Sequence, residues 1–437
     1  MPGANDLTLT TIKTILDEYS YIFISIACII LFICIIVYII ENANFIDNKC
    51  NKLNSFYKDK PALSSIKYNQ TAMENDIYLR DFYIKSAYNC CSLDSFKNSY
   101  LDICILKDII NQGVRFLDFQ IFSYDNRPVI STNTILCDKD EPEPLCYKIK
   151  QTFNVIEFNK VIQIIKNYAF SFNECPNPTD PIILHFRIMS NNLKIYDAMA
   201  DTIKYELNNV ILPKNYGYDS CENIGKLKIR DCMNKVIIIV DNNNTTYKET
   251  SLYEYVNASS GGSNGSVKLY KYDDIYNEID TTQLIAINKQ YLSIVIPNTS
   301  ITKYTNMDFN VTNNLGIQFT AMSYQFVDTN LLYYNDFFTE NKYALVLKPS
   351  DLRLILDTYY FEPEEINSGY EQAGTSQFMS TCTVQNPQTY VKLDTSNNCI
   401  DISGTILLTQ TCFEAGGVSM DASGYCYDSS GEQISLT

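Results

Sequence analysis

Two stretches decide the fold: Leu79–Cys91, LRDFYIKSAYNCC, and Gly113–Phe122, GVRFLDFQIF. Each alternates apolar and polar residues over a short run, which is typical of a strand with a buried face. Between them, Tyr100–Asn111 repeats apolar residues at helical spacing, and Gly113 supplies a helix stop. A strand, a helix and a second strand in this order predict a parallel pair joined by a crossover helix.

The same pattern continues through the middle of the chain. Helical spacing predicts further helices at residues 158–169 and 196–207. Residues 243–285 are rich in Gly, Ser and Asn without periodicity, so we expect a flexible linker there. The expected strands, five before the linker and three after it, are Phe82–Tyr88, Val114–Phe122, Pro128–Ser131, Pro181–Ile188, Lys235–Asp241, Tyr291–Pro297, Ile317–Tyr324 and Tyr343–Leu347. The fold class is therefore α/β, a TIM-type (β/α)8 barrel split by a flexible linker, with function expected at the carboxyl ends of its strands.

Composition shifts divide the chain into eight expected segments. They are a short tail (1–20), a transmembrane helix (21–40), a polar stalk (41–78), a first barrel half (79–242), the linker (243–285), a second barrel half (286–353), an acidic connector (354–380) and a small Cys-rich segment (381–437).

Tyr21–Ile40 contains no charged residue over 20 positions, enough helix to span a hydrocarbon core of about 30 Å. A cleaved signal peptide is the alternative, but it requires a basic start and a small-residue cleavage site. Residues 1–20 carry Lys13 against three acidic residues. We therefore expect an uncleaved single-pass anchor whose partner is the lipid bilayer.

The orientation of this anchor stays open. Four lysines just after the span favour a cytoplasmic domain, whereas abundant cysteines and N-x-S/T sequons favour the other side. The chain has 34 Tyr and no Trp, and its Ile and Asn are over-used, as expected of an AT-rich genome. A virion membrane of a large DNA virus or a host endomembrane is the expected location, with protein partners in a membrane or capsid assembly.

The residue inventory excludes several function classes. A net charge of −16, without a long basic run, argues against binding nucleic acid. A single histidine, His185, excludes any mechanism that needs two imidazoles from one chain, and excludes a His-rich zinc site.

Seven segments, in order, resemble phosphoinositide-specific phospholipase C, whose barrel is divided into X and Y halves by a variable linker. LRDFYIKSAYNCC resembles the family's LSHYFISSSHNTY, GVRFLDFQIF its GCRCVELDCW, and RPVISTN its PVVYHG. The other four are FNKVIQIIKNYAFSFNECPNPTDPIILHFRI, NIGKLKIRDCMNKVIIIV, NNLGIQFTAMSYQ and YALVLKPSDLR. The resemblance covers about residues 79–353 and implies a phospholipase C-like (PLC-like) phosphodiesterase barrel.

The resemblance also implies where the family's chemistry would lie. Its members cleave phosphodiesters with two histidines and a calcium ion held by carboxylate and amide side chains. The histidine positions fall on Tyr88 and Thr132, and neither side chain shuttles protons near pH 7 as imidazole does. We therefore expect a catalytically inactive barrel that serves as a structural or interaction protein.

The calcium positions are also changed. Asn89 is kept, whereas Asp118, Gln120 and Arg187 replace two glutamates and an aspartate, so we expect no calcium or other cofactor. A family position that carries a phosphate-binding lysine falls on Asp241.

Three interpretations of these changed positions stay open. In the first, Asp118, Gln120 and Arg187 form a buried ion-pair network at the barrel mouth. In the second, a pocket grips a phosphate or sugar through Asn89 and Arg187. In the third, Tyr88 and Asp118 serve as rewired acid and base of a phosphodiesterase. His185 has the strand parity of Arg187 and is expected to point into the barrel one layer deeper.

The tail holds four cysteines among small polar residues, namely Cys382, Cys399, Cys412 and Cys426. Little core is available there, which predicts two disulfides in any of three pairings. A zinc site is the alternative, but spacings of 17, 13 and 14 residues lack the short C-x2-C unit that such sites favour.

Overall fold

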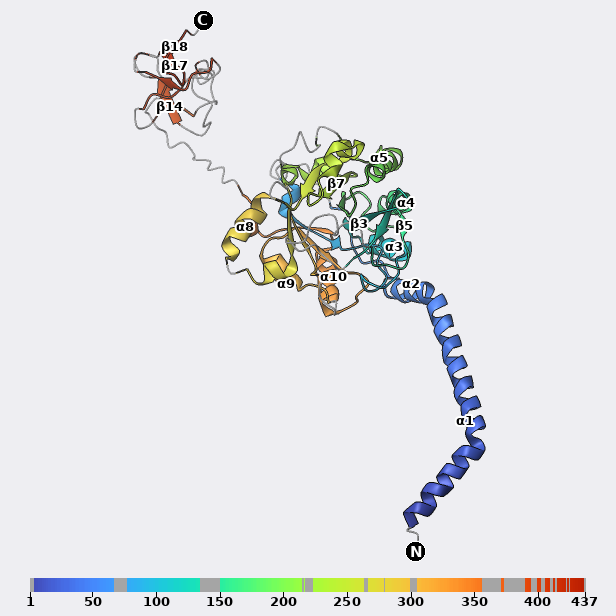
Figure 1. Cartoon of the computed structure of the whole chain (residues 1–437). Coiled ribbons are helices and arrows are strands. Elements are labelled where there is room, and N and C mark those ends of the chain that lie inside the picture. Colours follow the sequence, from blue (N-terminus) through green and yellow to red (C-terminus); the bar gives the residue numbers. More distant parts are fainter. Residues whose placement is uncertain are drawn as a thin grey trace. The chain divides into compact units, whose positions relative to one another are not determined.

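The computed structural model forms two compact units, Met1–Ile355 and Leu356–Thr437 (Figure 1). In the first unit it describes residues 4–66, 77–133, 150–213, 216, 223–262, 266–278, 280–298 and 305–355. In the second it describes residues 371–372, 390–393, 399–401, 405–408, 412, 415–421, 423 and 425–435.

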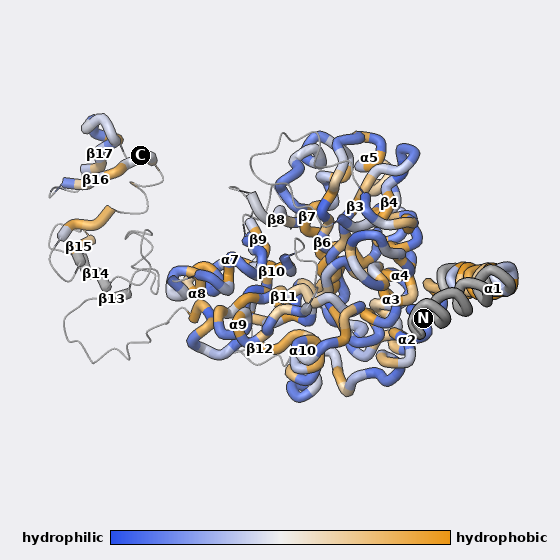
Figure 2. Tube along the Cα trace, turned by 60° about the horizontal axis from the view of Figure 1, so that its bottom comes forward, coloured by the Kyte–Doolittle hydropathy of each residue, from blue (hydrophilic) through white to orange (hydrophobic). Residues whose placement is uncertain are grey.

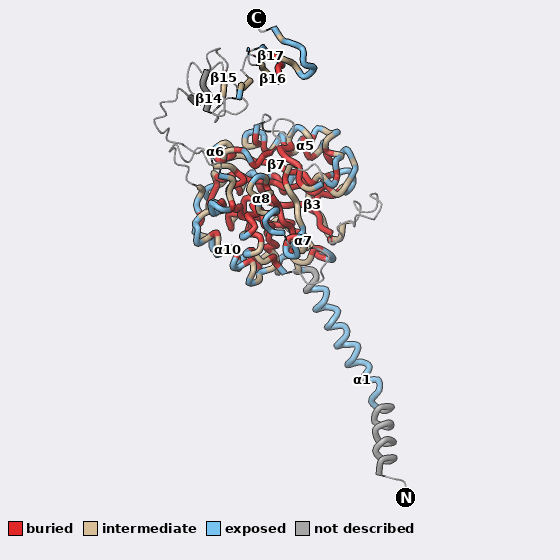
Figure 3. Tube along the Cα trace, turned by 90° about the vertical axis from the view of Figure 1, so that its left-hand side faces the viewer, coloured by how far each residue is buried: buried red, intermediate tan, exposed pale blue. Residues whose placement is uncertain are grey.

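Helix α1 (Ala4–Ala43) carries the apolar segment Tyr19–Ile40, which is long and apolar enough to cross a membrane or to act as a signal anchor (Figure 2). Its described side chains are exposed, in contrast to the barrel interior (Figure 3). None of this apolar window is buried inside the structure. This is the pattern that a bilayer, and not a protein core, would cover.

The segment after α1 is not the irregular stalk expected from its polarity. Residues Phe45–Phe56 form helix α2, which packs on α3 (Ile103–Asn111) and is joined to it by the Cys50–Cys104 disulfide. Leu53 is buried in this contact. The few apolar residues of 45–57 lie on one face, and tertiary contacts with the barrel stabilise a helix that polar composition alone does not indicate.

Eight parallel strands form a nearly closed barrel, which confirms the expected fold class. Their order is β8-β7-β6-β3-β2-β11-β10-β9, and a bridge between Ser260 and Val267 brings the two end strands together. The strands are β2 (Ser86–Ala87), β3 (Phe116–Tyr124), β6 (Ile182–Ile188), β7 (Val236–Asp241), β8 (Ala258–Ser260), β9 (Lys268–Lys271), β10 (Ser293–Ile296) and β11 (Phe319–Met322).

Two of the eight expected strands lie outside the barrel. The strand expected at 128–131 is β4 (Arg127–Ser131), which pairs antiparallel with β3 and with β5 (Ile156–Glu157). Asp125 and Asn126, both at positive φ, make a two-residue turn that permits only an antiparallel partner. The strand expected at 343–347 is β12 (Leu345–Leu347), which pairs antiparallel with β1 (Phe82–Ile84).

Strands β8 and β9 complete the barrel in their place, and both fall within the expected linker. Residues 243–285 also hold the 3-10 turns η5 (Thr246–Glu249) and η6 (Ser251–Tyr255), helix α7 (Tyr272–Tyr276) and the start of α8 (Thr281–Gln290). Asn257, which resembled a linker residue, accepts a hydrogen bond from the Ile238 N–H of β7. Polar side chains that satisfy backbone groups can thus support a strand that has no hydrophobic periodicity.

Helices surround the strands in Figure 1 and bury the faces expected from their periodicity. In α4 (Phe158–Ala169) the expected residues Phe158, Val161, Ile162, Ile165 and Ala169 are all buried. The corresponding residues of α5 (Leu193–Leu207) are buried as well. The other helices and 3-10 turns are α6 (Ile229–Cys232), α9 (Phe309–Asn314), α10 (Thr329–Asn341), η2 (Leu79–Asp81), η4 (Ile224–Lys226) and η7 (Ser350–Leu352).

The second unit contains two small antiparallel sheets. They are β13-β14-β15 (Glu371–Gln372, Tyr390–Leu393, Cys399–Asp401) and β16-β17-β18 (Ser419–Met420, Cys426–Tyr427, Gln433–Ile434). Cys412 is bonded to Cys426, and Cys399 is also in a disulfide. Cys382 lies outside the described residues. Cys399, Cys412 and Cys426 are therefore in disulfides where the sequence left a zinc site open.

We predict that removing the Cys50–Cys104 disulfide destabilises the barrel. The cross-link spans 54 residues, and losing such a constraint costs about 2–4 kcal/mol of unfolding free energy. A Cys50→Ser/Cys104→Ser variant should therefore melt at lower temperature in detergent, followed by circular dichroism. Cys412→Ser/Cys426→Ser is the matched control, and it should leave the barrel transition in place because that bond lies in the other unit.

Candidate functional site

The candidate site lies inside the barrel, where the neighbouring strands β3 and β6 direct polar side chains inward. Strand register places Asp118 of β3 opposite His185 of β6, and Gln120 opposite Arg187. All four are buried. Alternation along a strand sends residues two apart to the same face, so each strand contributes two of these side chains to the interior.

A bidentate ion pair between Asp118 and Arg187 is the central contact. Arg187 donates from Nε to Oδ1 at 2.9 Å and from Nη2 to Oδ2 at 2.6 Å. Burial alone would raise the pKa of Asp118, but the neighbouring guanidinium outweighs it and lowers that pKa to about 2. Asp118 is therefore ionised at every physiological pH.

Tyr88 and Asn89 close over this ion pair. The Asn89 Oδ1 accepts a hydrogen bond from Arg187 Nη2 at 3.0 Å, and the Asn89 N–H donates to Asp118 Oδ2 at 3.2 Å. The Arg187 guanidinium carbon lies 4.6 Å from the centre of the Tyr88 ring, in a cation–π contact. Burial raises the pKa of the Tyr88 hydroxyl to about 12, so this group stays protonated near pH 7.

His185 links Asp118 to a strand that the sequence did not predict. Its Nδ1 lies 2.8 Å from Asp118 Oδ1, and its Nε2 lies 2.7 Å from Ser260 Oγ on β8. Because Asp118 is ionised, Nδ1 carries the proton that bridges them, and Nε2 shares a second hydrogen bond with the serine hydroxyl. This is the connectivity of a serine-hydrolase triad, yet all three side chains lack exposed surface and the carboxylate is shared with Arg187. The arrangement acts as a cross-link between β3, β6 and β8.

The remaining predicted site residues lie beside this network but not in it. Gln120 exchanges two hydrogen bonds with Asn133, at 3.0 and 2.9 Å, in place of joining the ion pair. Thr132 donates to the Phe96 carbonyl at 2.8 Å. The Phe96 ring also meets the Tyr88 ring edge-on at 5.2 Å, so Phe96 is near both positions that the resemblance assigned to histidines.

Sequence reasoning missed Phe96 and Ser260. Phe96 lies in a loop with no periodic pattern, and Ser260 lies in the segment expected to be a linker. The register also pairs Ser260 with Asp241, whose carboxylate accepts from the Asn243 N–H at 3.0 Å. Burial raises the pKa of Asp241, the reverse of the shift at Asp118.

Three buried donors in this site have no hydrogen-bond partner among the described residues. They are the Tyr88 hydroxyl, Asn89 Nδ2 and Arg187 Nη1. The Arg187 and Asn89 side chains lie close enough to the Tyr88 hydroxyl to lower its pKa, but none of these atoms completes a hydrogen bond. Unsatisfied donors are costly in a core, so each of these three groups would gain from an acceptor such as a water or an anion oxygen.

The residues at the family's calcium positions do not fit a calcium ion. Calcium requires several oxygen ligands around it. Here Arg187 takes both carboxylate oxygens of Asp118 and the side-chain oxygen of Asn89, and its positive charge would repel a cation. One other set of described side chains has metal-ligand spacing, Cys50, Asp102 and Cys104, but its two sulfurs are joined in the disulfide.

Two solved structures share this fold. The chain aligns with PLC21 of L. pealei at 15% identity over 64% of its own length and 38% of that protein, with a TM-score of 0.50. It aligns with PLC21 of S. officinalis at 14% identity over 66% and 40% of the two chains, again with a TM-score of 0.50. No family model and no curated protein matches the chain. The chain spans about two fifths of the length of these two solved proteins. At 14% to 15% identity, the likeness shows a PLC-like barrel fold.

We predict that Asp118→Asn is strongly destabilising at pH 7. It leaves the Arg187 charge buried without its counter-ion, which costs about 3–5 kcal/mol of unfolding free energy. The double variant Asp118→Asn/Arg187→Met should lose less than the single one, since neither charge remains buried. Because the pKa of Asp118 is lowered, its stabilisation is present above about pH 4 and is lost as pH falls through 2. The difference between wild type and Asp118→Asn should shrink over that interval in chemical denaturation.

Asp241→Asn is the matched control for this prediction. Asp241 is a buried carboxylate in the same interior, but burial raises its pKa. Neutralising it should leave stability at pH 7 unchanged or higher. An equal loss from both substitutions would mean that general packing, and not the ion pair, accounts for the effect.

Proposed function

We propose that this protein is a membrane-anchored PLC-like barrel that does not cleave phosphodiesters and acts as a structural or interaction protein. The observation that carries the proposal is the Asp118–Arg187 ion pair beside Tyr88. The pair and its neighbours occupy four positions where the family resemblance would place catalytic or calcium-binding groups, and they bind one another there. Its partners would be other proteins of the same membrane, or of a viral particle assembled on it.

The chemistry of these groups supports inactivity. Phosphodiester cleavage needs a base for the attacking hydroxyl and an acid for the leaving group, each with a pKa near the working pH. The pKa of Tyr88 is about 12 and that of Asp118 about 2, so neither exchanges a proton readily near pH 7. Thr132 supplies an alcohol that binds a backbone carbonyl. A rewired phosphodiesterase using Tyr88 and Asp118 is therefore the weaker alternative.

The activity assay uses the full chain in detergent or vesicles, with phosphatidylinositol and glycerophosphodiesters as substrates. We expect no product above a protein-free blank, with calcium or with chelator. An active phospholipase C run alongside shows that the substrates are competent. Turnover that Asp118→Asn/Arg187→Met removes, while that variant still shows the folded circular dichroism spectrum, would overturn the proposal.

A second candidate function is binding of a phosphate or sugar without turnover. The observation that favours it is the set of unpartnered donors on Tyr88, Asn89 and Arg187. Donors of this kind suit an oxygen of an anionic ligand, and Arg187 Nη1 is among the atoms without a partner. A bound water is the simpler occupant.

Thermal shift with inositol phosphates and with inorganic phosphate tests this second function. Binding at 100 times Kd would add about 2.7 kcal/mol of stability, which is several degrees in the melting temperature. Asn89→Leu should abolish the shift. Asn133→Leu, which removes a buried amide outside the donor set, is the control and should retain it. No shift with any of these ligands would leave water as the occupant.

A further inference from the structure

The barrel surface next to the anchor is the subject of this inference. Phe45, the first residue of α2, follows the last residue of the apolar span, Ile40, by only five positions. At helical rise this distance is about 7–8 Å. The headgroup region of a bilayer extends about 5–8 Å beyond the hydrocarbon core. If Tyr19–Ile40 spans a membrane, Phe45 lies at headgroup level.

Two further aromatic rings continue from Phe45 across the barrel surface. The Phe45 and Tyr100 ring centres are 5.5 Å apart, and those of Tyr100 and Phe153 are 5.1 Å apart. We name Phe45, Tyr100 and Phe153 the aromatic row. Phe153 is 61% exposed, so this apolar ring projects outward from the end of the row.

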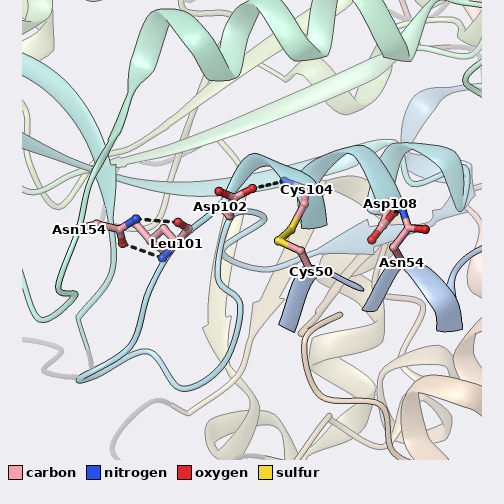
Figure 4. The surroundings of a disulfide bond; sticks show 7 residues. All are labelled: Cys50, Asn54, Leu101, Asp102, Cys104, Asp108 and Asn154. Carbon is pink, nitrogen blue, oxygen red and sulfur yellow. Dashed lines mark hydrogen bonds between the residues drawn. A yellow bond between two sulfur atoms is a disulfide. The ribbon is translucent and has the colours of Figure 1, made fainter. Parts of the chain in front are cut away.

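The backbone holds Phe153 in this exposed position. The Phe153 N–H donates to the Ser99 carbonyl at 2.9 Å, and the Asn98 N–H donates to the Gln151 carbonyl at 2.7 Å. Asn154 then bonds both the N–H and the carbonyl of Leu101, each at 2.8 Å (Figure 4). Four hydrogen bonds thus join residues 98–101 to residues 151–154, and the ring is presented on a fixed surface.

The same surface is tied covalently to the helix that follows the anchor. Figure 4 shows the Cys50–Cys104 disulfide at the start of α3, three residues after Leu101, with Asn54 and Asp108, which share a hydrogen bond, further along the helix. The disulfide and the packing of α2 hold Phe45 against Tyr100. The position of the row relative to the start of α2 is therefore fixed.

We propose that the aromatic row lies in the headgroup zone of the bilayer that α1 spans, so that the barrel rests on the membrane along this face. The proposal relies on the membrane anchor of the proposed function. Tyr is enriched at this depth because its ring leaves water while its hydroxyl stays hydrated. Phe rings add apolar surface of the kind that interfacial helices bury at the headgroup boundary. Lys49 lies over the Phe45 ring, with its ammonium 5.5 Å from the ring centre, and pairs with Asp94.

The absence of tryptophan from the chain makes a direct test possible. Phe153→Trp introduces a single fluorescent reporter into the full-length protein, which is reconstituted in phosphatidylcholine vesicles containing brominated lipids. We expect blue-shifted emission and quenching at least twofold stronger than in the control. The control is Tyr276→Trp, which replaces a 64% exposed ring on α7 that belongs to no part of the row.

Flotation of the same samples tests the membrane anchor separately from the contact between the aromatic row and the bilayer. Protein that floats with vesicles but shows equal quenching at both positions overturns the membrane contact and leaves the anchor standing. Protein that does not float lacks the anchor, and both proposals fail. Adding Cys50→Ser/Cys104→Ser to Phe153→Trp should reduce the quenching while flotation persists; unchanged quenching would show that the disulfide does not hold the row in place.

Discussion

The buried pair of Asp118 and Arg187 is the interaction on which the barrel interior depends. Two opposite charges without solvent are tolerated only where geometry and further hydrogen bonds compensate for their lost hydration. Here Asn89 and His185 supply those bonds, and His185 extends the network to Ser260. The network joins Asp118 of β3, through His185 of β6, to Ser260 of β8. A site that resembles a catalytic centre thus forms a structural cross-link.

The same interaction supports the proposal that the chemistry of the family resemblance is lost. A general acid or base must gain and lose a proton during turnover, whereas Arg187 keeps Asp118 ionised throughout. A calcium ion would have to displace a guanidinium that already satisfies the same oxygens. Catalysis requires a side chain that gains and loses a proton, whereas the stable ion pair requires one that stays charged. The contacts observed here favour stability.

The side of the barrel next to α1 is stabilised differently. A disulfide and backbone hydrogen bonds hold it together in place of a buried ion pair. The Cys50–Cys104 disulfide turns a polar segment into part of the folded unit, and hydrogen bonds between two loops fix an exposed aromatic ring. A domain tethered by a single helix would otherwise be free to reorient. If α1 is the proposed membrane anchor, this rigid connection restricts which face of the barrel meets the bilayer.

The sequence by itself determined the apolar span, the barrel class, the buried faces of α4 and α5, and the inward direction of Asp118, His185 and Arg187, because periodicity and strand parity are local properties. It indicated eight strands but misassigned two of them. Asp125–Asn126 makes β4 a hairpin strand, and β8 and β9 arise from polar residues whose order comes from their neighbours. The Cys50–Cys104 bond, the partners of Gln120 and Thr132, and the roles of Phe96 and Ser260 were decided only by the tertiary structure. Each of these contacts joins side chains that are distant in sequence, and no local pattern encodes which of them meet.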